Sequence, residues 1–311
     1  MMSAQPKLLV VNEFHPHTIA LLDQKYDTVH LWKHDRREVI ADLQGMCRAA
    51  ATASWECDPI VYELNSLELI AAFGVGVDGI DFNKTTDKGI RVTNTPDVLN
   101  DAVADLAIAL ILMTSRNLVG ADRFLRAGHW LNGAFPFGTG LAGKTLGILG
   151  LGRIGEAIAE RALPLKLAIA YHNRSKKDLP YRYCASIAEL ADYSDILLNM
   201  LPGGKETRHL VNADVFGKLG SDGLFINVGR GSTVNEQDLI DALESGVIAA
   251  AGLDVYENEP SVPRGLIESD KTVLLPHLGS ATVETRREMG NVVLGNLEAF
   301  FANEELATEI G

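Results

Sequence analysis

The stretch 145-TLGILGLGRIGEAIAERALPLKLAIAYHNRS-175 decides the fold. An apolar, strand-like run ends at a G-x-G-x-x-G motif over residues 150–155, and a helix-like pattern rich in Ala, Ile and Glu follows. In this setting the first glycine permits a tight turn, the second lets a pyrophosphate approach the backbone, and the third lets helix and strand pack closely. The motif predicts a parallel α/β sheet that binds a dinucleotide at a helix N-terminus. A glycine-rich turn without a ligand is the alternative.

The end of the next strand, 167–172, indicates which nucleotide binds. A site for NAD usually carries Asp or Glu there, because the carboxylate accepts a hydrogen bond from the ribose 2′-hydroxyl. His172 stands at this position, followed by Asn173, Arg174 and Ser175. The guanidinium fork of Arg174 suits a phosphate, and its two neighbours can add hydrogen bonds. The stretch predicts NADP(H). The alternative is that Arg174 is a solvated loop charge and the site accepts either cofactor.

Strand-like and helix-like runs alternate along nearly the whole chain of 311 residues, which predicts two doubly wound parallel α/β sheets, Rossmann-like or flavodoxin-like, with a cleft between the domains. Strands are expected at residues 7–12, 27–32, 48–54, 69–74 and 90–94, and then at 144–150, 167–172, 195–200, 223–229, 248–255 and 272–276. We expect residues 1–99 and 281–311 to form a discontinuous substrate-binding domain, because the amphipathic tail 282–306 can fold back onto the first strands. Residues 100–280 then form the NADP-binding domain.

The segment 100–128 joins the two sets of strands. Its apolar residues recur at helical spacing over several turns, and Asn100 or Asp101 can cap the start. The pattern predicts one long, buried helix that bridges the domains. A helix of this apolarity also suits a contact between subunits, so we expect a homodimer.

Composition excludes several classes of protein. The formal charge of −13 argues against a nucleic acid partner, because affinity for a phosphate backbone comes from clustered Lys and Arg. The longest apolar block, 106–113, is too short to span a bilayer, and the N-terminus lacks the pattern of a secretory leader, so no membrane partner is expected. Cys47, Cys57 and Cys184 show neither metal-binding nor redox spacing. They predict a cytoplasmic protein with reduced thiols and no bound metal.

Three ionisable residues, Arg230, Glu259 and His277, stand where strands of the second set are expected to end. Parallel strands bring their carboxyl ends to one edge of the sheet, the edge that also holds the nucleotide. Reduction of a 2-keto acid needs a cation for the carboxylate, a proton donor for the carbonyl oxygen, and a group that keeps this donor protonated. Each residue alone could be an ordinary loop or cap residue. Their joint occurrence after a nucleotide motif predicts a small-molecule 2-keto acid reductase.

The chain resembles the D-isomer-specific 2-hydroxyacid dehydrogenase family over nearly its full length. The stretches that carry the resemblance are 73-FGVGVDGID-81, 93-TNTPDVLNDAVADLA-107, GLGRIG at 150–155, 227-NVGRG-231, 252-GLDVYENEP-260 and 276-PHLGSAT-282. The separations of Arg230, Glu259 and His277 also match those of the family's trio. Within the family, NTPDVL and YHNRS look most like NADPH-dependent glyoxylate/hydroxypyruvate reductases. Asp97 departs from the glycine of many relatives, and His172 replaces the usual acid.

The resemblance implies roles for individual residues. Val75 and Gly76 would hold the substrate carboxylate through backbone N–H groups, with Arg230 as a further substrate contact, and a 74-GVG-76 turn can present such amides to an anion. The expected cofactor contacts are Gly150, Gly152, Arg153, Ile154, Gly155, Asn173, Arg174, Ser175, Leu201, Pro202, Thr207, Val228, Gly229, Asp254, His277 and Gly279. His277 would act as general acid and Glu259 would orient it, giving a D-2-hydroxy acid. Trp130 resembles an aromatic residue that reaches the neighbouring subunit's substrate pocket.

Competing interpretations remain at this stage. One is an NAD-dependent dehydrogenase of the phosphoglycerate type, although such enzymes often carry extra C-terminal domains. A formate dehydrogenase is less favoured, because its relatives pair the histidine with Gln. A third is a non-catalytic, nucleotide-sensing protein of the corepressor kind, since one fold serves several functions. The sequence leaves open which 2-keto acid is the physiological substrate.

Overall fold

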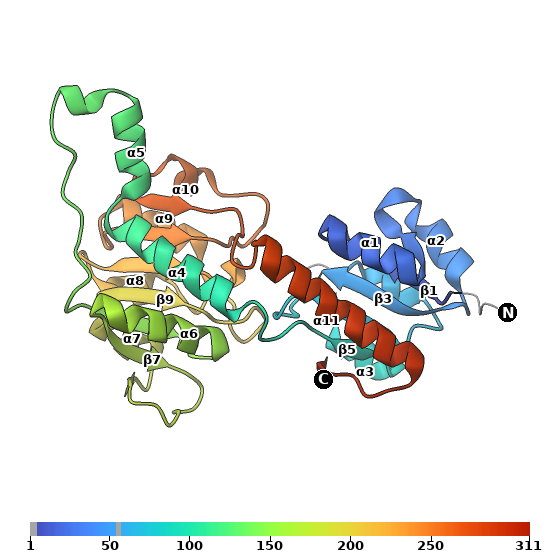
Figure 1. Cartoon of the computed structure of the whole chain (residues 1–311). Coiled ribbons are helices and arrows are strands. Elements are labelled where there is room, and N and C mark those ends of the chain that lie inside the picture. Colours follow the sequence, from blue (N-terminus) through green and yellow to red (C-terminus); the bar gives the residue numbers. More distant parts are fainter. Residues whose placement is uncertain (1–4, 54–56) are drawn as a thin grey trace. The chain divides into compact units, whose positions relative to one another are not determined.

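The chain folds into two compact units in the computed structural model, which describes residues 5–53 and 57–311. Unit 1 comprises Met1–Leu99 and Ala281–Gly311, and unit 2 comprises Asn100–Ser280. Each unit has one largely parallel sheet with helices on both faces (Figure 1). The predicted fold class, two doubly wound parallel α/β domains, is confirmed.

Sheet A, the sheet of unit 1, has the strand order β13-β5-β4-β3-β1-β2. Its strands are β1 (Lys7–Val10), β2 (Asp27–His30), β3 (Cys47–Ala53), β4 (Leu69–Phe73), β5 (Arg91–Thr93) and the antiparallel β13 (Glu309–Ile310). The end of the predicted strand 48–54 lies outside the described residues. Strand β1 lies between β2 and β3. The chain therefore continues from β1 to β2 in one direction across the sheet, and from β3 to β4 in the other. The carboxyl ends of β1 and β3 form a topological switch point, where open α/β sheets bind ligands.

Helices cover both faces of sheet A. They are α1 (Pro16–Lys25), α2 (Arg36–Leu43), α3 (Phe82–Lys88) and α11 (Val283–Ala302). Side chains alternate along β4, so that Ile70 and Ala72 join the cluster that contains the buried residues of α2. Helix α11 lies against β4 and α1, and its buried residues Met289, Val293 and Leu297 recur at helical spacing. The amphipathic tail therefore packs on sheet A.

Sheet B, the sheet of unit 2, has the strand order β12-β11-β10-β9-β6-β7-β8, and all neighbouring strands run parallel. Its strands are β6 (Thr145–Leu149), β7 (Ala168–His172), β8 (Arg182–Tyr183), β9 (Ile196–Asn199), β10 (Leu224–Asn227), β11 (Ala250–Leu253) and β12 (Thr272–Leu274). Strand β6 lies between β7 and β9. The switch point of sheet B is therefore at the carboxyl ends of β6 and β9.

The two faces of sheet B pack against different helices. One face holds α4 (Asn100–Ser115) and α6 (Arg153–Ala162), and the other holds α7 (Ile187–Tyr193), α8 (Ala213–Leu219), α9 (Glu236–Glu244) and α10 (Arg264–Glu268). Side chains along β6 point alternately to the two faces of the sheet. Ile148 therefore packs in the core with α4 and α6, whereas its neighbour Leu149 packs with the helices of the opposite face. The short strands β8 and β13 were missed because two residues carry no readable periodicity.

The prediction of one continuous helix over 100–128 is wrong. Helix α4 ends at Ser115, α5 (Leu118–Arg126) follows, and the pair bends by 60°. Asn117 makes the break, because it adopts the left-handed conformation with φ 45° and its side chain accepts a hydrogen bond from the Gly120 amide to cap α5. Helix α4 is largely buried, whereas α5 has no buried residue. The apolar pattern continues through the bend, so the periodicity of the sequence does not reveal where the helix breaks.

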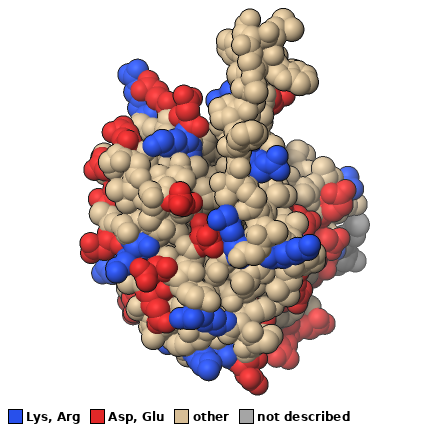
Figure 2. Space-filling model, turned by 90° about the vertical axis from the view of Figure 1, so that its left-hand side faces the viewer, with Lys and Arg blue, Asp and Glu red and all other residues tan. Residues whose placement is uncertain are grey.

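The segment 117–138, which we call the arm, extends from the rest of unit 2 (Figure 1). It contains α5 and the short 3₁₀ helix η3 (His129–Leu131). Figure 2 shows that its projecting end carries few charged side chains. Its large apolar residues are exposed, Trp130 to 69%, Leu131 to 92% and Phe137 fully. An exposed apolar surface of this kind is typical of an interface with another protein.

Within residues 5–53 and 57–311, no single helix is both long and apolar enough to cross a membrane. Helices α4 and α5 pass that test only as a pair, and the pair is bent. The three cysteines are free and buried. Burial raises the pKa of the Cys47, Cys57 and Cys184 thiols, which keeps them in the unreactive protonated form.

Candidate active site

The three glycines of the 150–155 motif have three different environments. Gly150 follows β6 with φ 95°, a conformation that L side chains rarely adopt. A Cβ on Gly155 would lie 2.9 Å from the Gly150 carbonyl oxygen, so only glycine lets α6 approach the turn. A Cβ on Gly152 would meet no protein atom within 4 Å. The motif therefore opens to the outside at its second glycine alone, where a pyrophosphate is expected to approach.

The N-terminus of α6 offers hydrogen-bond donors at the same place. Gly152 is the N-cap residue, and no side chain in the described part of the chain caps the helix. The first N–H groups of a helix have no partner within the helix, and its dipole places partial positive charge there. Helix α6 therefore presents amide groups and positive potential at the carboxyl end of β6, which suits an anion.

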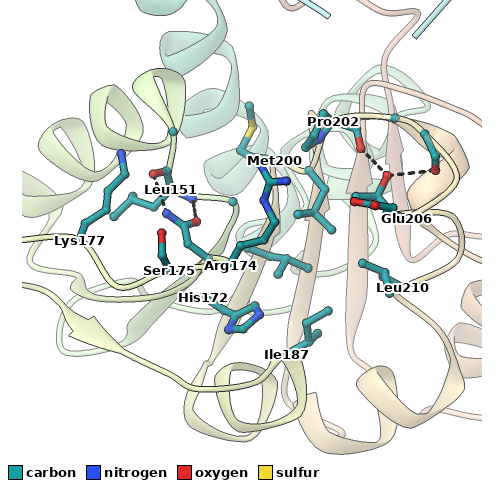
Figure 3. Close-up of a pocket in the computed structure, with 18 of the residues that line it drawn as sticks. Leu151, His172, Arg174, Ser175, Lys177, Ile187, Met200, Pro202, Glu206 and Leu210 are labelled. Carbon is teal, nitrogen blue, oxygen red and sulfur yellow. Dashed lines mark hydrogen bonds between the residues drawn. The ribbon is translucent and has the colours of Figure 1, made fainter. Parts of the chain in front are cut away.

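A cavity of about 690 Å³ adjoins this helix terminus (Figure 3). It is formed at the carboxyl ends of β6, β7 and β9 and is lined by Leu149, Gly150, Leu151, Gly152, His172, Asn173, Arg174, Ser175, Lys177, Ile187, Met200, Leu201, Pro202, Gly203, Gly204, Lys205, Glu206, Thr207 and Leu210. The apolar residues of this set can contact a flat ring, whereas the basic residues can contact a phosphate. Its size and position fit the adenosine part of a dinucleotide.

The turn after β7 supplies the basic wall of the cavity. Arg174 is exposed, and no described residue forms an ion pair or hydrogen bond with its guanidinium. In Figure 3 its side chain lies between Ser175 and Met200. Lys177 also lines the cavity but pairs with Glu156 of α6. Arg174 is therefore the side chain on this wall that is ready to bind an external anion.

His172 and Asn173 support the loops of the cavity. Nδ1 of His172 donates to the Cys184 carbonyl oxygen at 2.9 Å, which fixes the ring beside the turn. The Asn173 side chain binds the backbone of Leu151 twice, accepting from its N–H at 2.6 Å and donating to its carbonyl oxygen at 3.0 Å. The sequence indicated that Asn173 adds a hydrogen bond to a phosphate. In the structure this side chain holds the loop of the 150–155 motif, and its contact with a phosphate stays a prediction.

The residues at the end of β7 fit NADP(H). The carboxylate that would accept from a ribose 2′-hydroxyl is replaced by His172, and the Arg174 guanidinium, which has no partner among the described residues, follows it. A carboxylate would repel a 2′-phosphate, whereas an unpaired guanidinium attracts one and can bind two of its oxygens. Among the described residues that line the cavity, the only carboxylate is that of Glu206, at the end formed by the 203–207 loop.

A histidine–carboxylate pair lies beyond β11 and β12. Nδ1 of His277 is 2.7 Å from Oε2 of Glu259, and both side chains are about one third exposed, at 31% and 30%. Oε1 of Glu259 accepts from the Tyr256 amide at 2.9 Å, which fixes the carboxylate. Burial raises the pKa of Glu259, but hydrogen bonds from His277 and Tyr256, together with the charges of His277 and Arg230, outweigh it and hold this pKa below its ordinary value. Glu259 is therefore an anion that stabilises a protonated imidazole.

Asp254 positions the segment that carries His277. Its carboxylate accepts from the Leu278 amide at 2.7 Å and the Gly279 amide at 2.9 Å, and its own carbonyl oxygen accepts from the His277 amide at 2.8 Å. His277 has φ 52°, a conformation that these bonds hold in place. Burial raises the pKa of the Asp254 carboxyl above its ordinary value, even though the two amide bonds lower it.

Arg230 lies on a segment that is closely packed against this region. A Cβ on the next residue, Gly231, would lie 1.8 Å from the Tyr256 carbonyl carbon, so no larger residue fits there. A hydrogen-bonded pair of buried asparagines lies under the same segment. Asn227 accepts from the Gly229 amide and donates to the Arg230 carbonyl oxygen, and Asn199 donates to Asn227. The backbone at Arg230 is therefore held from two sides.

In unit 1, the 74–76 turn follows β4 and is fixed by the loop after β5. Thr95 binds Gly74 in both directions, because its hydroxyl accepts from the Gly74 amide at 3.0 Å and its amide donates to the Gly74 carbonyl oxygen at 2.9 Å. Nδ2 of Asn94 donates to the Val75 carbonyl oxygen at 2.9 Å. A trans peptide points its N–H away from its carbonyl oxygen. The Gly76 N–H is therefore directed away from Asn94.

Comparison with protein families identifies the chain. Residues 108–279 match the family described as D-isomer specific 2-hydroxyacid dehydrogenase, NAD binding domain. This match covers more than half of the chain and includes the glycine motif and all three candidate catalytic residues. The chain belongs to the D-isomer specific 2-hydroxyacid dehydrogenase family.

Relatives within the family cover almost all of the chain. Glyoxylate/hydroxypyruvate reductase A of Arabidopsis thaliana is 45% identical over 293 residues, which are 93% of this chain and 94% of the relative. Hydroxyphenylpyruvate reductase of Plectranthus scutellarioides is 44% identical over 298 residues, with the same two shares. A solved structure of the NADPH-dependent glyoxylate/hydroxypyruvate reductase of Sinorhizobium meliloti, in complex with NADP and malonate, superposes with a TM-score of 0.94 at 43% identity. That match covers 99% of this chain and 97% of the other.

The cofactor residues named from the sequence fall into two groups. Eight of them line the cavity: Gly150, Gly152, Asn173, Arg174, Ser175, Leu201, Pro202 and Thr207. The others do not line it: Arg153, Ile154, Gly155, Val228, Gly229, Asp254, His277 and Gly279. Of these, Gly155 packs α6 against the turn, Gly229 would place a Cβ 2.8 Å from the Leu201 carbonyl oxygen, and Gly279 is bound by Asp254. The second group thus shapes the loops around the cavity or lies farther along the edge of sheet B.

Sequence reasoning missed the side chains that hold these loops. Asn94, Asn199 and Asn227 are at least nine tenths buried and stand at or just after the end of a strand. A buried asparagine needs several hydrogen bonds, so its place at a strand end is the signal that could have found it. It also missed Lys177 and Ile187 on the cavity wall, because neither belongs to a motif.

Proposed function

We propose that this family member reduces small 2-keto acids, such as glyoxylate and hydroxypyruvate, to D-2-hydroxy acids with NADPH. The observation that carries the proposal is the 2.7 Å bond between His277 and Glu259, on the sheet whose first strand ends in the dinucleotide motif. Arg230 follows another strand of the same sheet at its carboxyl edge. The sheet thus carries a histidine that can donate a proton, the carboxylate hydrogen-bonded to it, and a cation.

His277 delivers the proton in the proposed reaction. Nδ1 binds the Glu259 carboxylate, so in the imidazolium form Nε2 holds the proton that can be donated. The keto oxygen takes this proton and becomes the hydroxyl group, and the imidazole is left neutral with Nδ1–H still bound to Glu259. The Tyr256 amide keeps the carboxylate in place during the transfer. Glu259 acts through His277 and is therefore a positioning residue.

Arg230 and the 74–76 turn bind the substrate in this proposal. The amides of Val75 and Gly76 hold the substrate carboxylate, and the Arg230 guanidinium stabilises negative charge on the carboxylate and on the keto oxygen. Bound NADPH supplies the hydride that the keto carbon accepts. Gly152, the α6 terminus, Arg174 and Ser175 would hold the nucleotide, with the guanidinium at the 2′-phosphate.

Steady-state kinetics test the proposal directly. Purified protein is mixed with NADPH and either glyoxylate or hydroxypyruvate, and the loss of reduced nicotinamide is followed against a sample without keto acid. We expect substrate-dependent oxidation, and a kcat/KM for NADPH well above that for NADH. A preference for NADH would favour the phosphoglycerate type of dehydrogenase. Tight NADPH binding without turnover on a panel of keto acids would favour a nucleotide-sensing protein.

A homodimer formed through the arm belongs to the same proposal. Leu131 is 92% exposed and Phe137 fully exposed, and a second copy of the chain would bury this surface. Sedimentation should give a dimer for the native chain and a monomer for Leu131→Asp. A monomeric native protein at micromolar concentration would contradict this part of the proposal.

The two units take different roles in this scheme. Unit 1 binds the substrate carboxylate through its 74–76 turn, and unit 2 binds NADPH and carries the proton donor. A cytoplasmic location stays a prediction from the sequence, and the three free cysteines agree with a reducing compartment.

A further inference from the structure

A half-buried arginine without an acidic partner lies in unit 1. Arg286 stands in the first turn of α11, and its guanidinium lies over the Phe73 ring, 5.6 Å from the centroid. No described residue gives it an ion pair or a hydrogen bond to the side chain. Burial lowers the pKa of the guanidinium below its ordinary value. A cation in the first turn is also disfavoured by the helix dipole.

These features cost stability, and the contact with the Phe73 ring offsets part of that cost. Local arrangements that oppose stability are expected where a residue serves a ligand. Arg48 and Arg91 of unit 1, by contrast, are paired with Glu68 and Glu309. Arg286 therefore differs from them in being held ready for an external partner.

A small cavity of about 190 Å³ surrounds this guanidinium. Its lining residues are Glu13, Phe14, His15, Ala53, Phe73 and Arg286. Phe14 and Phe73 stack with their centroids 5.3 Å apart and form an apolar wall. Glu13 and Arg286 are the charged groups of the cavity, one an acceptor and the other a donor. A hydrogen bond on an apolar wall is stronger than one in water.

The cavity lies at the switch point of sheet A. Phe14 follows β1 closely, Ala53 ends β3, and Phe73 ends β4. Ligands of open α/β sheets bind where such strands diverge. Phe73 also immediately precedes Gly74, so the cavity adjoins the 74–76 turn, which in the proposed function holds the substrate carboxylate.

We propose that Arg286 and Glu13 bind a hydroxyl group on carbon 3 of the substrate and so select 3-hydroxy-2-keto acids over those without this group. The inference rests on the proposed function. The Arg286 guanidinium donates to the hydroxyl oxygen, and the Glu13 carboxylate accepts the hydroxyl proton. A hydroxyl satisfies both groups at once. A second carboxylate would bind Arg286 but would be repelled by Glu13, and a methyl group would satisfy neither.

Kinetic selectivity tests the inference. Arg286→Met keeps the length of the side chain and removes its charge, and Arg287→Met is the matched control because Arg287 is the exposed neighbour on the same helix turn. The ratio of kcat/KM for hydroxypyruvate to that for glyoxylate should fall by about 10- to 100-fold in Arg286→Met, the usual effect of losing a hydrogen bond to a charged group. Arg287→Met should leave the ratio unchanged. An equal change for both substrates in Arg286→Met would overturn the inference.

Two further measurements separate this role from others. Titration of the NADPH complex with D-glycerate and glycolate, which cannot react with the reduced cofactor, should show that Arg286→Met removes the preference for glycerate. This titration tests the hydroxyl site even if the native protein reduces neither keto acid. A lack of reduction would contradict the proposed function, not the hydroxyl site. Thermal unfolding of Arg286→Met should occur at or above the native temperature, because an unpaired charge is removed. A marked loss of stability with unchanged glycerate preference would assign Arg286 a structural role.

Discussion

The switch points of sheet A and sheet B have the same topology but present different groups to a ligand. In sheet B the backbone dominates, with an open Gly152 and the amides of the α6 terminus. The sheet A cavity instead presents two charged side chains, Glu13 and Arg286, that lie far apart in the chain. Backbone recognition requires glycines at fixed spacing and therefore leaves a motif. Recognition by side chains requires only that distant segments meet in the fold, so it leaves no motif in the sequence.

The largest expected effect is on the rate of the chemical step and leaves cofactor binding nearly unchanged. His277→Ala should lower kcat by about 10²- to 10⁴-fold, the usual contribution of a positioned acid. The loss should be similar for glyoxylate and hydroxypyruvate, because the proton donor acts on the keto oxygen that both share. Calorimetry should show NADPH binding close to that of the native protein. Turnover at the native rate would mean that another group donates the proton.

The sequence predicted the chemistry of sheet B better than that of sheet A for this same reason. The 150–155 motif and the lone Arg174 can be read from neighbouring residues, and the cavity beside them contains both. The hydrogen bond between His277 and Glu259 was expected from the order of strands, because parallel strands end at one edge. The fold class followed from the alternation of strand and helix patterns.

What could not be predicted depends on tertiary contacts. Arg286 reads as an ordinary polar residue of an amphipathic helix until α11 is packed against β4. The bend at Asn117 was missed because the apolar pattern runs through it. The hydrogen bonds between Asn173 and Leu151 could not be predicted either, because they join two separate loops. Each of these features depends on which partner a side chain finds in the folded chain.

A smaller effect is expected at the wall of the sheet B cavity. Arg174→Asp removes a cation and adds a charge that repels a 2′-phosphate, so kcat/KM for NADPH should fall by about 10- to 100-fold relative to NADH. The comparison of the two cofactors in one variant controls for folding. Equal losses for both would show that Arg174 does not contact the 2′-phosphate.

A pair of glycine variants separates ligand access from packing within the motif. Gly155→Ala brings a methyl group against the Gly150 carbonyl oxygen and should lower the free energy of unfolding by about 1–3 kcal/mol. Gly152→Ala meets no protein atom, so it should leave thermal stability unchanged and weaken NADPH binding. Unfolding curves and nucleotide titrations on both variants measure this. If Gly152→Ala bound NADPH as tightly as the native chain, the pyrophosphate would have to lie elsewhere.

The smallest expected effect is the pH dependence of stability contributed by Glu259. Its pKa in the folded chain lies below the ordinary value of 4.5, so its ionised form stabilises the native state above that pH, and this contribution is lost as the pH falls through the lower, folded value. Glu259→Gln cannot ionise. It should therefore unfold about 2 °C below the native chain near about pH 6, and the difference should shrink as the pH falls below about 4. Thermal unfolding of both proteins across this range provides the measurement. A difference that stayed constant with pH would mean that the carboxylate acts through its shape and hydrogen bonds alone. Glu259 would then resemble the neutral side chain of Asn173, which holds Leu151 by hydrogen bonds, more than a charged partner of His277.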